Sequence, residues 1–160
     1  MLKLYKKTGS AMDYHEAWAE GREIVEHWGV VGDRGESKKH QRPFFSTKRG
    51  SIAKILGEAV ESGYRSIDLD QHYRAIIEFA AEGFGTPEQI AKLERLRDRM
   101  DETLGWTGLG HCDGYSIGSG TMEVCCFVVD FQIASRVISD DLVDTEFSDY
   151  TRIYDEDADV

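Results

Sequence analysis

The chain has 160 residues, of which 41% are hydrophobic and 11% aromatic, so one or two packed domains are feasible and wholesale disorder is excluded. No apolar run approaches the ~20 residues that a membrane-spanning helix needs, and the N-terminal segment lacks the apolar stretch of a signal peptide. Together with an odd number of cysteines, three in all, these features predict a cytoplasmic protein with reduced thiols and no membrane association.

The net charge of −11 is unevenly spread along the chain. Residues 1–67 contain 12 basic and 9 acidic side chains, a balance of +3, whereas residues 68–160 contain 7 basic and 21 acidic ones, a balance of −14. The change predicts two units, residues 1–67 and 68–154, followed by an acidic tail at residues 155–160 that we expect to be mobile. A chain this acidic repels nucleic acid overall, so any site for a polyanion is expected in the first unit.

The first unit is expected to be a small antiparallel sheet crossed by one helix. Its β-branched, aromatic and alternating segments predict strands at residues 2–5, 13–19, 23–31 and 37–45. Glycines at both ends of residues 32–35 predict a tight turn after the third strand, and Pro43 places the fourth near an edge or an end. The helix follows from one apolar stripe at helical spacing, formed by Ile52, Ile55, Leu56, Ala59 and Val60. Ser46 or Thr47 is expected to cap this helix, and Gly63 to end it.

The second unit is expected to be ferredoxin-like. Strands are predicted at residues 73–80, 109–116, 122–129 and 150–154, and helices begin at Thr86-Pro87 and after Asp130. The resulting order β-α-β-β-α-β is that of a split βαβ unit with its helices on one sheet face. The apolar run at residues 124–129 lacks alternation, which predicts either a central strand covered on both faces or a strand at an interdomain contact. The fold class is therefore α+β, with two units of different composition.

The first unit resembles the WGR domain. The resemblance lies in the Trp28-Gly29-Val30 core, the following Gly32 and Gly35, and a helix that leads to Gly63-Tyr64, and it covers residues 1–67. It departs from the family at the defining third position, where Val30 replaces arginine. In the poly(ADP-ribose) polymerases that carry it, this domain contacts damaged DNA and the catalytic domain. Other WGR-like proteins are small bacterial proteins of unassigned activity, and the resemblance implies a binding module of that kind.

An aromatic side chain beside basic residues is the first candidate site. Trp28 would stack on a sugar or base while nearby cations contact phosphates, as in a nucleic-acid platform. In the alternative, Trp28 is a core anchor and the basic run is a solvated surface or a complement to an acidic protein. Val30 in place of arginine and the acidic second unit favour this alternative. The candidate binding residues are Trp28, Arg34, Lys38, Lys39 and Arg42.

A glycine-rich region of the second unit is the other candidate. Imidazole, thiol and carboxylate groups occur there in succession and are the groups that bind metals or activate nucleophiles. Consecutive strand residues point to opposite faces, and no metal-ligand spacing is present, so a hairpin without chemistry is the simpler interpretation. The candidate pocket residues are His111, Cys112, Asp113, Ser119 and Glu123.

The sequence thus favours a non-catalytic binding or regulatory protein that acts on a protein partner. Nucleic-acid binding through Trp28 is one alternative, and a small-ligand site or enzyme around His111-Cys112-Asp113 is another. No catalytic residue, metal or cofactor is predicted, and the oligomeric state is left open.

Overall fold

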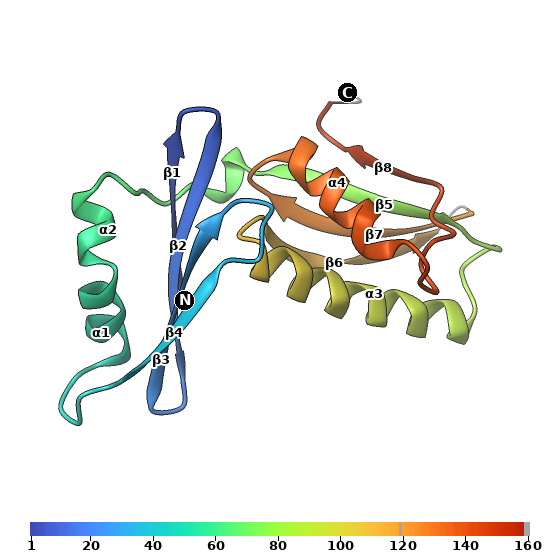
Figure 1. The fold of residues 1–160 in the computed structure, drawn as a ribbon. Coiled ribbons are helices and arrows are strands. Elements are labelled where there is room, and N and C mark those ends of the chain that lie inside the picture. The colour runs from blue at the N-terminus through green and yellow to red at the C-terminus, as the bar shows by residue number, and fades with distance from the viewer. Residues whose placement is uncertain (119, 159–160) are drawn as a thin grey trace. The chain divides into compact units, whose positions relative to one another are not determined.

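The computed structural model describes residues 1–118 and 120–158. The chain divides into two compact units, Met1–Asp68 and Leu69–Val160, each built on its own four-stranded sheet (Figure 1). All neighbouring strands are antiparallel and both units carry helices, so the expected α+β class is confirmed. Within the described residues, no helix is long and apolar enough to cross a membrane.

The sheet of the first unit is a simple meander. Its strands lie in the order β1 (Leu2–Thr8), β2 (Ala11–Glu20), β3 (Glu23–Val30) and β4 (Glu36–Gln41). The fourth strand was expected to reach residue 45 but ends at Gln41. Pro43 has no N–H to donate to the ladder, and the last backbone bond on this side runs from Arg42 N to Arg22 O at 3.1 Å.

Two short helices replace the single helix predicted from the apolar stripe. They are α1 (Lys48–Ile55) and α2 (Gly57–Glu61), and they are separated at Leu56, whose ψ is 1°. Thr47 caps α1 by accepting a hydrogen bond from Gly50 N, and Gly63 has the left-handed φ of 101° expected of a helix end. Val60 was expected in the core but is 43% exposed, because the break at Leu56 shifts the helical phase.

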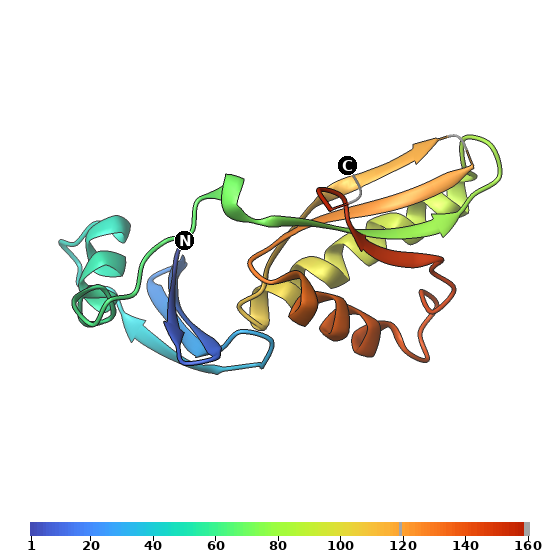
Figure 2. The same ribbon diagram turned by 90° about the horizontal axis from the view of Figure 1, so that it is seen from above.

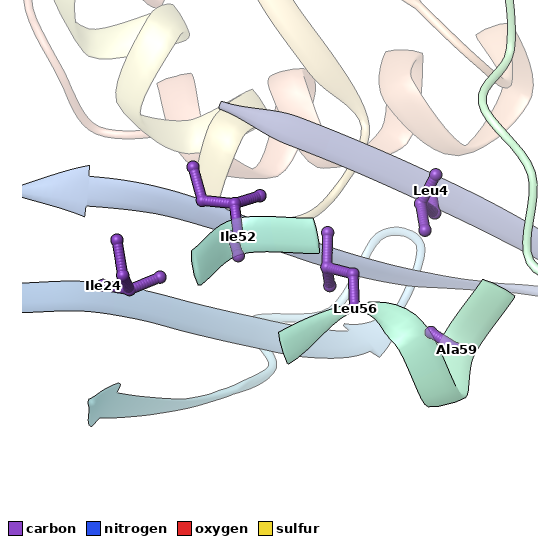
Figure 3. Close-up of a cluster of buried hydrophobic side chains, with 6 residues drawn as sticks. Leu4, Ile24, Ile52, Leu56 and Ala59 are labelled. Carbon is purple, nitrogen blue, oxygen red and sulfur yellow. The ribbon is translucent and has the colours of Figure 1, made fainter. Parts of the chain in front are cut away.

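The core of the first unit lies between the sheet and these helices. The sheet contributes Leu4, Ala17 and Ile24 to it. The helices contribute Ile52, Leu56 and Ala59, and Figure 3 shows these side chains gathered between the two layers. Full burial of one large aliphatic side chain contributes ~1.5–3 kcal/mol, so this small cluster supplies much of the unit's stability. Tyr64 folds back against the cluster, as expected.

The second unit has the strand order of a split βαβ fold. Its elements are β5 (Tyr73–Ala80), α3 (Pro87–Trp106), β6 (Gly110–Gly118), β7 (Thr121–Val128), α4 (Phe131–Leu142) and β8 (Arg152–Asp155), preceded by a 3₁₀ turn at Leu69–Gln71. The sheet order is β6-β7-β5-β8, so β7 lies between the parallel strands that α3 connects. Figure 2 shows α3 and α4 on the same side of this sheet, which leaves its other face without a helix.

One expectation for the second unit, a strand covered on both faces, was wrong. Val124 and Cys126 are buried, whereas Cys125 and Phe127 are half-buried, so β7 is covered on one face only. The apolar side chains on its other face misled the sequence-based interpretation. The acidic tail was predicted at residues 155–160; its first residue, Asp155, belongs to β8, and residues 159 and 160 lie outside the described part of the chain. The next residues are held by Arg74, whose guanidinium lies 2.6 Å from Asp157 Oδ1 and 2.8 Å from Glu156 Oε2.

Candidate functional site

The glycine-rich turn after Trp28 folds back onto the ring of Tyr14. A Cβ at Gly35 would clash with the Trp28 carbonyl oxygen and lie 2.5 Å from the Tyr14 hydroxyl. A Cβ at Gly29 would lie 2.8 Å from Gly35 Cα, so both positions require glycine. Gly32 adds a φ of 98°, which disfavours any side chain. The glycines of this stretch therefore serve close packing.

A buried polar network holds this turn to the sheet. The Tyr14 hydroxyl accepts a hydrogen bond from Gly35 N at 2.9 Å and lies 3.0 Å from His27 Nε2. His27 Nδ1 lies 2.8 Å from Glu16 Oε1, and Lys3 Nζ lies 3.1 Å from Glu16 Oε2. A hydroxyl, an imidazole and a carboxylate in this order would suit nucleophilic catalysis at an open site. Tyr14, His27 and Glu16 are at most 3% exposed, so the network stabilises the fold instead.

The network makes stability sensitive to alkaline pH. Burial raises the pKa of Tyr14 to about 12, and the negative charge of Glu16 adds to the rise, while the Gly35 N–H opposes it. The folded state therefore keeps a proton that the unfolded chain gives up near pH ~10. This stabilisation is intact below that pH and is lost as the pH rises toward 12. Urea titrations from pH 9 to ~12 should show a shallower decline in unfolding free energy for Tyr14→Phe than for wild type; equal declines would contradict the assignment.

Trp28 itself lies on the opposite sheet face from His27. Its ring is half-buried and its centroid lies 5.9 Å from that of His15. His15 and His40 both bond to Glu26, with Nε2–O distances of 2.7 and 2.6 Å. Among the residues that the structure describes, no group of His, Cys, Asp and Glu side chains could hold a metal ion. Trp28 is thus a partly covered side chain on the same sheet face as the core residues Leu4, Ala17 and Ile24.

The predicted basic residues do not form one surface. Lys38 and Lys39 alternate across β4, so only Lys38 lies on the Trp28 side of the sheet. Lys39 bonds to Glu20 at 2.6 Å on the other side, which raises the pKa of its ammonium group. Arg34 is exposed on the turn at one end of β4, whereas Arg42 follows the other end. The structure therefore separates the five residues that the sequence grouped together.

An exposed aromatic pair stands in the loop between β4 and α1. Phe44 is 85% exposed and Phe45 is 99% exposed, and their ring centroids lie 5.6 Å apart in a T-shaped arrangement. The loop beneath them is ordered by Ser46, whose Oγ donates to Pro43 O at 2.8 Å and lies 2.9 Å from Ser51 Oγ. The two rings therefore project from a hydrogen-bonded loop that holds their backbone in place.

Unpaired cations surround this pair. In the part of the chain that the structure describes, Arg42, Lys48, Arg49 and Lys54 have no carboxylate within salt-bridge distance. In the second unit most cations face carboxylates at 2.6 to 3.0 Å. Six of its seven basic side chains do so, Arg136 being the exception among the described residues, and the six are Arg74, Lys92, Arg95, Arg97, Arg99 and Arg152. We define the β4–α1 surface as Arg42, Phe44, Phe45, Lys48, Arg49 and Lys54.

Two hollows flank α1 within this surface. The first has a volume of about 440 Å³ and lies between α1 and the β3–β4 side of the sheet, where Ile24, Arg42 and Lys54 line it. The second has a volume of about 660 Å³ and is lined by Leu2, Ile52 and the rim residues Lys48 and Arg49. Both combine an apolar lining with cations, so this part of the unit can receive apolar groups that carry negative charge.

The glycine-rich candidates of the second unit do not converge. Cys112 lies opposite the buried Cys126 on the sheet side that the helices cover, and its Sγ donates to Cys125 O at 3.4 Å. His111 is exposed and stacks near Phe127, and Asp113 is exposed at the bulge between Cys112 and Gly114. Ser119 lies outside the described residues. Burial, followed by the charge of Asp113, raises the pKa of Cys125 to about 11, so this thiol stays protonated at neutral pH.

Glu123 instead belongs to a polar cluster on the open sheet face, and sequence reasoning missed its other members. It lies directly opposite Glu78, and its carboxylate oxygens are 3.2 Å from Ser116 Oγ and 3.3 Å from the Tyr154 hydroxyl. Arg152 pairs with Glu78 at 3.0 Å and lies 4.0 Å above the Tyr154 ring. Like charges opposite each other are unfavourable unless they are partnered, as they are here. No local sequence pattern predicts this cluster, because its members come together only through the order of the strands in the sheet.

No protein-family model matches the chain, and neither the curated proteins nor the solved structures contain a significantly similar one. The β4–α1 surface is the place where exposed aromatic rings, unpaired cations and hollows coincide in the first unit. Its sequence signal was available, because Phe44-Phe45 directly follows a proline in an otherwise polar, basic stretch.

Proposed function

We propose that the protein is a non-catalytic binding protein that recognises a protein partner through the β4–α1 surface. The observation that carries this proposal is the exposure of Phe44 and Phe45, at 85% and 99%, on an ordered loop. Burying a phenylalanine against a partner contributes ~1.5–3 kcal/mol, and aromatic residues and arginine are typical of the few residues that dominate binding energy. Two solvent-exposed phenylalanine rings on a hydrogen-bonded loop are therefore typical of a protein-binding surface.

The cations of this surface indicate the charge of the partner. Arg42, Lys48 and Arg49 lack carboxylate partners among the described residues. An acidic protein surface would provide those carboxylates. Such complementarity speeds association and excludes basic competitors. A single-stranded nucleic acid would use the same groups, but the net charge of −11 opposes a long polyanion. A folded or extended acidic protein segment fits both facts.

The first unit is, in this proposal, a WGR-like module of a cytoplasmic protein. Support for the module comes from the Trp28-Gly29 core and from the Gly63-Tyr64 end of its helical segment. Support for the compartment comes from the odd number of cysteines, which suits a reducing environment. The loss of arginine at Val30 agrees with a binding surface that lies elsewhere on the unit, at the β4–α1 loop.

The test is partner capture with a matched pair of aromatic variants. Phe44→Ala/Phe45→Ala should reduce capture of the specific partner from source cells by at least ~10-fold, which corresponds to about 1.4 kcal/mol. Unfolding free energy should stay within ~0.5 kcal/mol of wild type, since the removed rings are exposed. Phe84→Ala is the control, because Phe84 is 88% exposed in the second unit and should leave capture unchanged. Equal capture by all three proteins would refute the proposal.

A further inference from the structure

The smaller hollow beside α1 has the lining of a binding site for an apolar anion. Its accessible apolar lining comes from Ile55 of α1, next to the fully buried Ile24 of β3. Its cationic lining comes from Arg42 and Lys54, and the His40 imidazole lies beside them. No aspartate or glutamate of the described chain lines it. Its volume of about 440 Å³ falls in the range of hollows that hold small ligands, ~300–1,000 Å³.

Some polar groups of this hollow already have hydrogen-bond partners within the protein, and others do not. The Ser46 hydroxyl donates to Pro43 O, and the Ser51 hydroxyl lies 2.9 Å from Ser46 Oγ, so both hydroxyls hold the loop. His40 Nε2 lies 2.6 Å from Glu26, which anchors its ring. The guanidinium of Arg42 and the ammonium of Lys54 have no such partner within the described residues. Two cations therefore remain available to a ligand, above an apolar floor.

We propose that this hollow binds a carboxylate that is attached to an apolar group, and that its occupant is the C-terminal residue of the partner protein. A guanidinium receives a carboxylate through two parallel hydrogen bonds, and Lys54 adds a second positive charge. Ile55, the partly exposed isoleucine of the lining, takes the apolar side chain and keeps water from the ion pair, which strengthens the ion pair. A chain end with an apolar side chain carries both groups on one residue. The proposal rests on the proposed function and names what the partner offers.

The continuity of the hollow with the aromatic pair supports this occupant. Pro43 lines the hollow and leads directly into Phe44-Phe45. A chain that ends in the hollow can therefore place its preceding residues against the two rings. Internal acidic side chains lack an apolar body at the charged end, and inorganic phosphate lacks one altogether, so neither would use the apolar surface of Ile55.

The test is a set of amide chemical-shift titrations of the full-length ¹⁵N-labelled protein. The probes are acetyl-Gly-Gly-Phe with a free carboxylate, the same peptide as its C-terminal amide, and 3-phenylpropanoate. The free-acid peptide should produce saturable shifts confined to Ile24 and residues 40–55, and the amide should bind at least ~10-fold more weakly. Arg42→Gln and Lys54→Gln should each weaken the acid by ~5-fold or more. Lys38→Gln, which removes an exposed cation of β4 outside the hollow, should leave it unchanged.

Three results would overturn the proposal: equal binding of acid and amide, shifts away from both Ile24 and residues 40–55, or no shifts at all. If 3-phenylpropanoate bound more tightly than the peptide, the occupant would be a small carboxylate and the chain-end assignment would fall. The outcome is separate from the capture experiment. If the hollow bound the carboxylate but capture did not depend on Phe44 and Phe45, the proposed function would be wrong and the carboxylate site would stand. If capture depended on Phe44 and Phe45 but the hollow bound no carboxylate, the proposed function would stand and the carboxylate site would be wrong.

Discussion

Gly35→Ala is expected to destabilise the first unit by about 3 kcal/mol or more, since overpacking of this severity exceeds the usual ~1–3 kcal/mol. The added methyl group would collide with the Trp28 carbonyl oxygen and crowd the Tyr14 hydroxyl, at 2.5 Å. Neither atom can move freely, because one belongs to β3 and the other accepts the hydrogen bond from Gly35 N. Chemical denaturation followed by the fluorescence of the tryptophans measures the loss.

Gly57→Ala is the matched control for this variant. Gly57 begins α2, and a Cβ there meets nothing within 4 Å. Since alanine is ~1 kcal/mol better than glycine inside a helix, this variant should be unchanged or slightly more stable. A Gly35→Ala protein as stable as Gly57→Ala would contradict the assigned role of the turn.

Glu16→Leu is the second large effect, with an expected loss of about 3–5 kcal/mol, the usual result of removing one partner of a buried ion pair. The substitution leaves His27 Nδ1 without its acceptor at 2.8 Å and Lys3 Nζ without its carboxylate at 3.1 Å. His27 is 1% exposed, so water does not replace the lost acceptor. Equilibrium unfolding at pH 7 measures the difference.

Glu20→Leu provides the comparison on the same strand. Glu20 bonds to Lys39 at 2.6 Å, but both side chains are 57% exposed, and such pairs contribute only ~0–1 kcal/mol. The two variants remove the same charge from β2 at different depths. A Glu16→Leu loss no larger than that of Glu20→Leu would show that the network is not a stabilising one.

Local signals in the sequence predicted most elements. Strand β5 lies where it was expected, and Thr86 forms the full capping box with Gln89. The predictions that Gly63 ends the helical segment and that Tyr64 folds back were also confirmed. These features depend on a few neighbouring residues, so sequence suffices for them. The break at Leu56 was missed, because both halves of the helical segment follow one apolar spacing.

The candidate surfaces were harder to predict, because they depend on which residues share a face. The run Lys38-Lys39 was treated as one patch, although strand alternation places its members on opposite sides. The pairing of Glu78 with Glu123 requires the strand order, which no local pattern gives. Phe44 and Phe45 were assigned to a strand, where one ring of the pair would have been covered; Pro43 instead ends the pairing and leaves both exposed.

The stretch from His27 to Gly35 now has a physical account. His27 joins the buried network, Gly29 and Gly35 admit the Tyr14 hydroxyl, and Val30 is 40% exposed at the end of β3. His27, Gly29 and Gly35 therefore serve the fold of the unit. The groups left for recognition lie at the other end of β4, where aromatic rings and cations remain without partners in the described structure.

The most direct test places a photo-crosslinking benzoylphenylalanine at either of two positions in living source cells. Position 45 probes the β4–α1 surface, and position 30, which carries the exposed Val30, probes the end of the Trp28 strand. We expect irradiation to crosslink the protein that carries benzoylphenylalanine at position 45 to one discrete partner protein. The protein that carries it at position 30 should form no crosslink. Crosslinking at position 30 alone, or at neither position, would contradict the assignment of recognition to the β4–α1 surface.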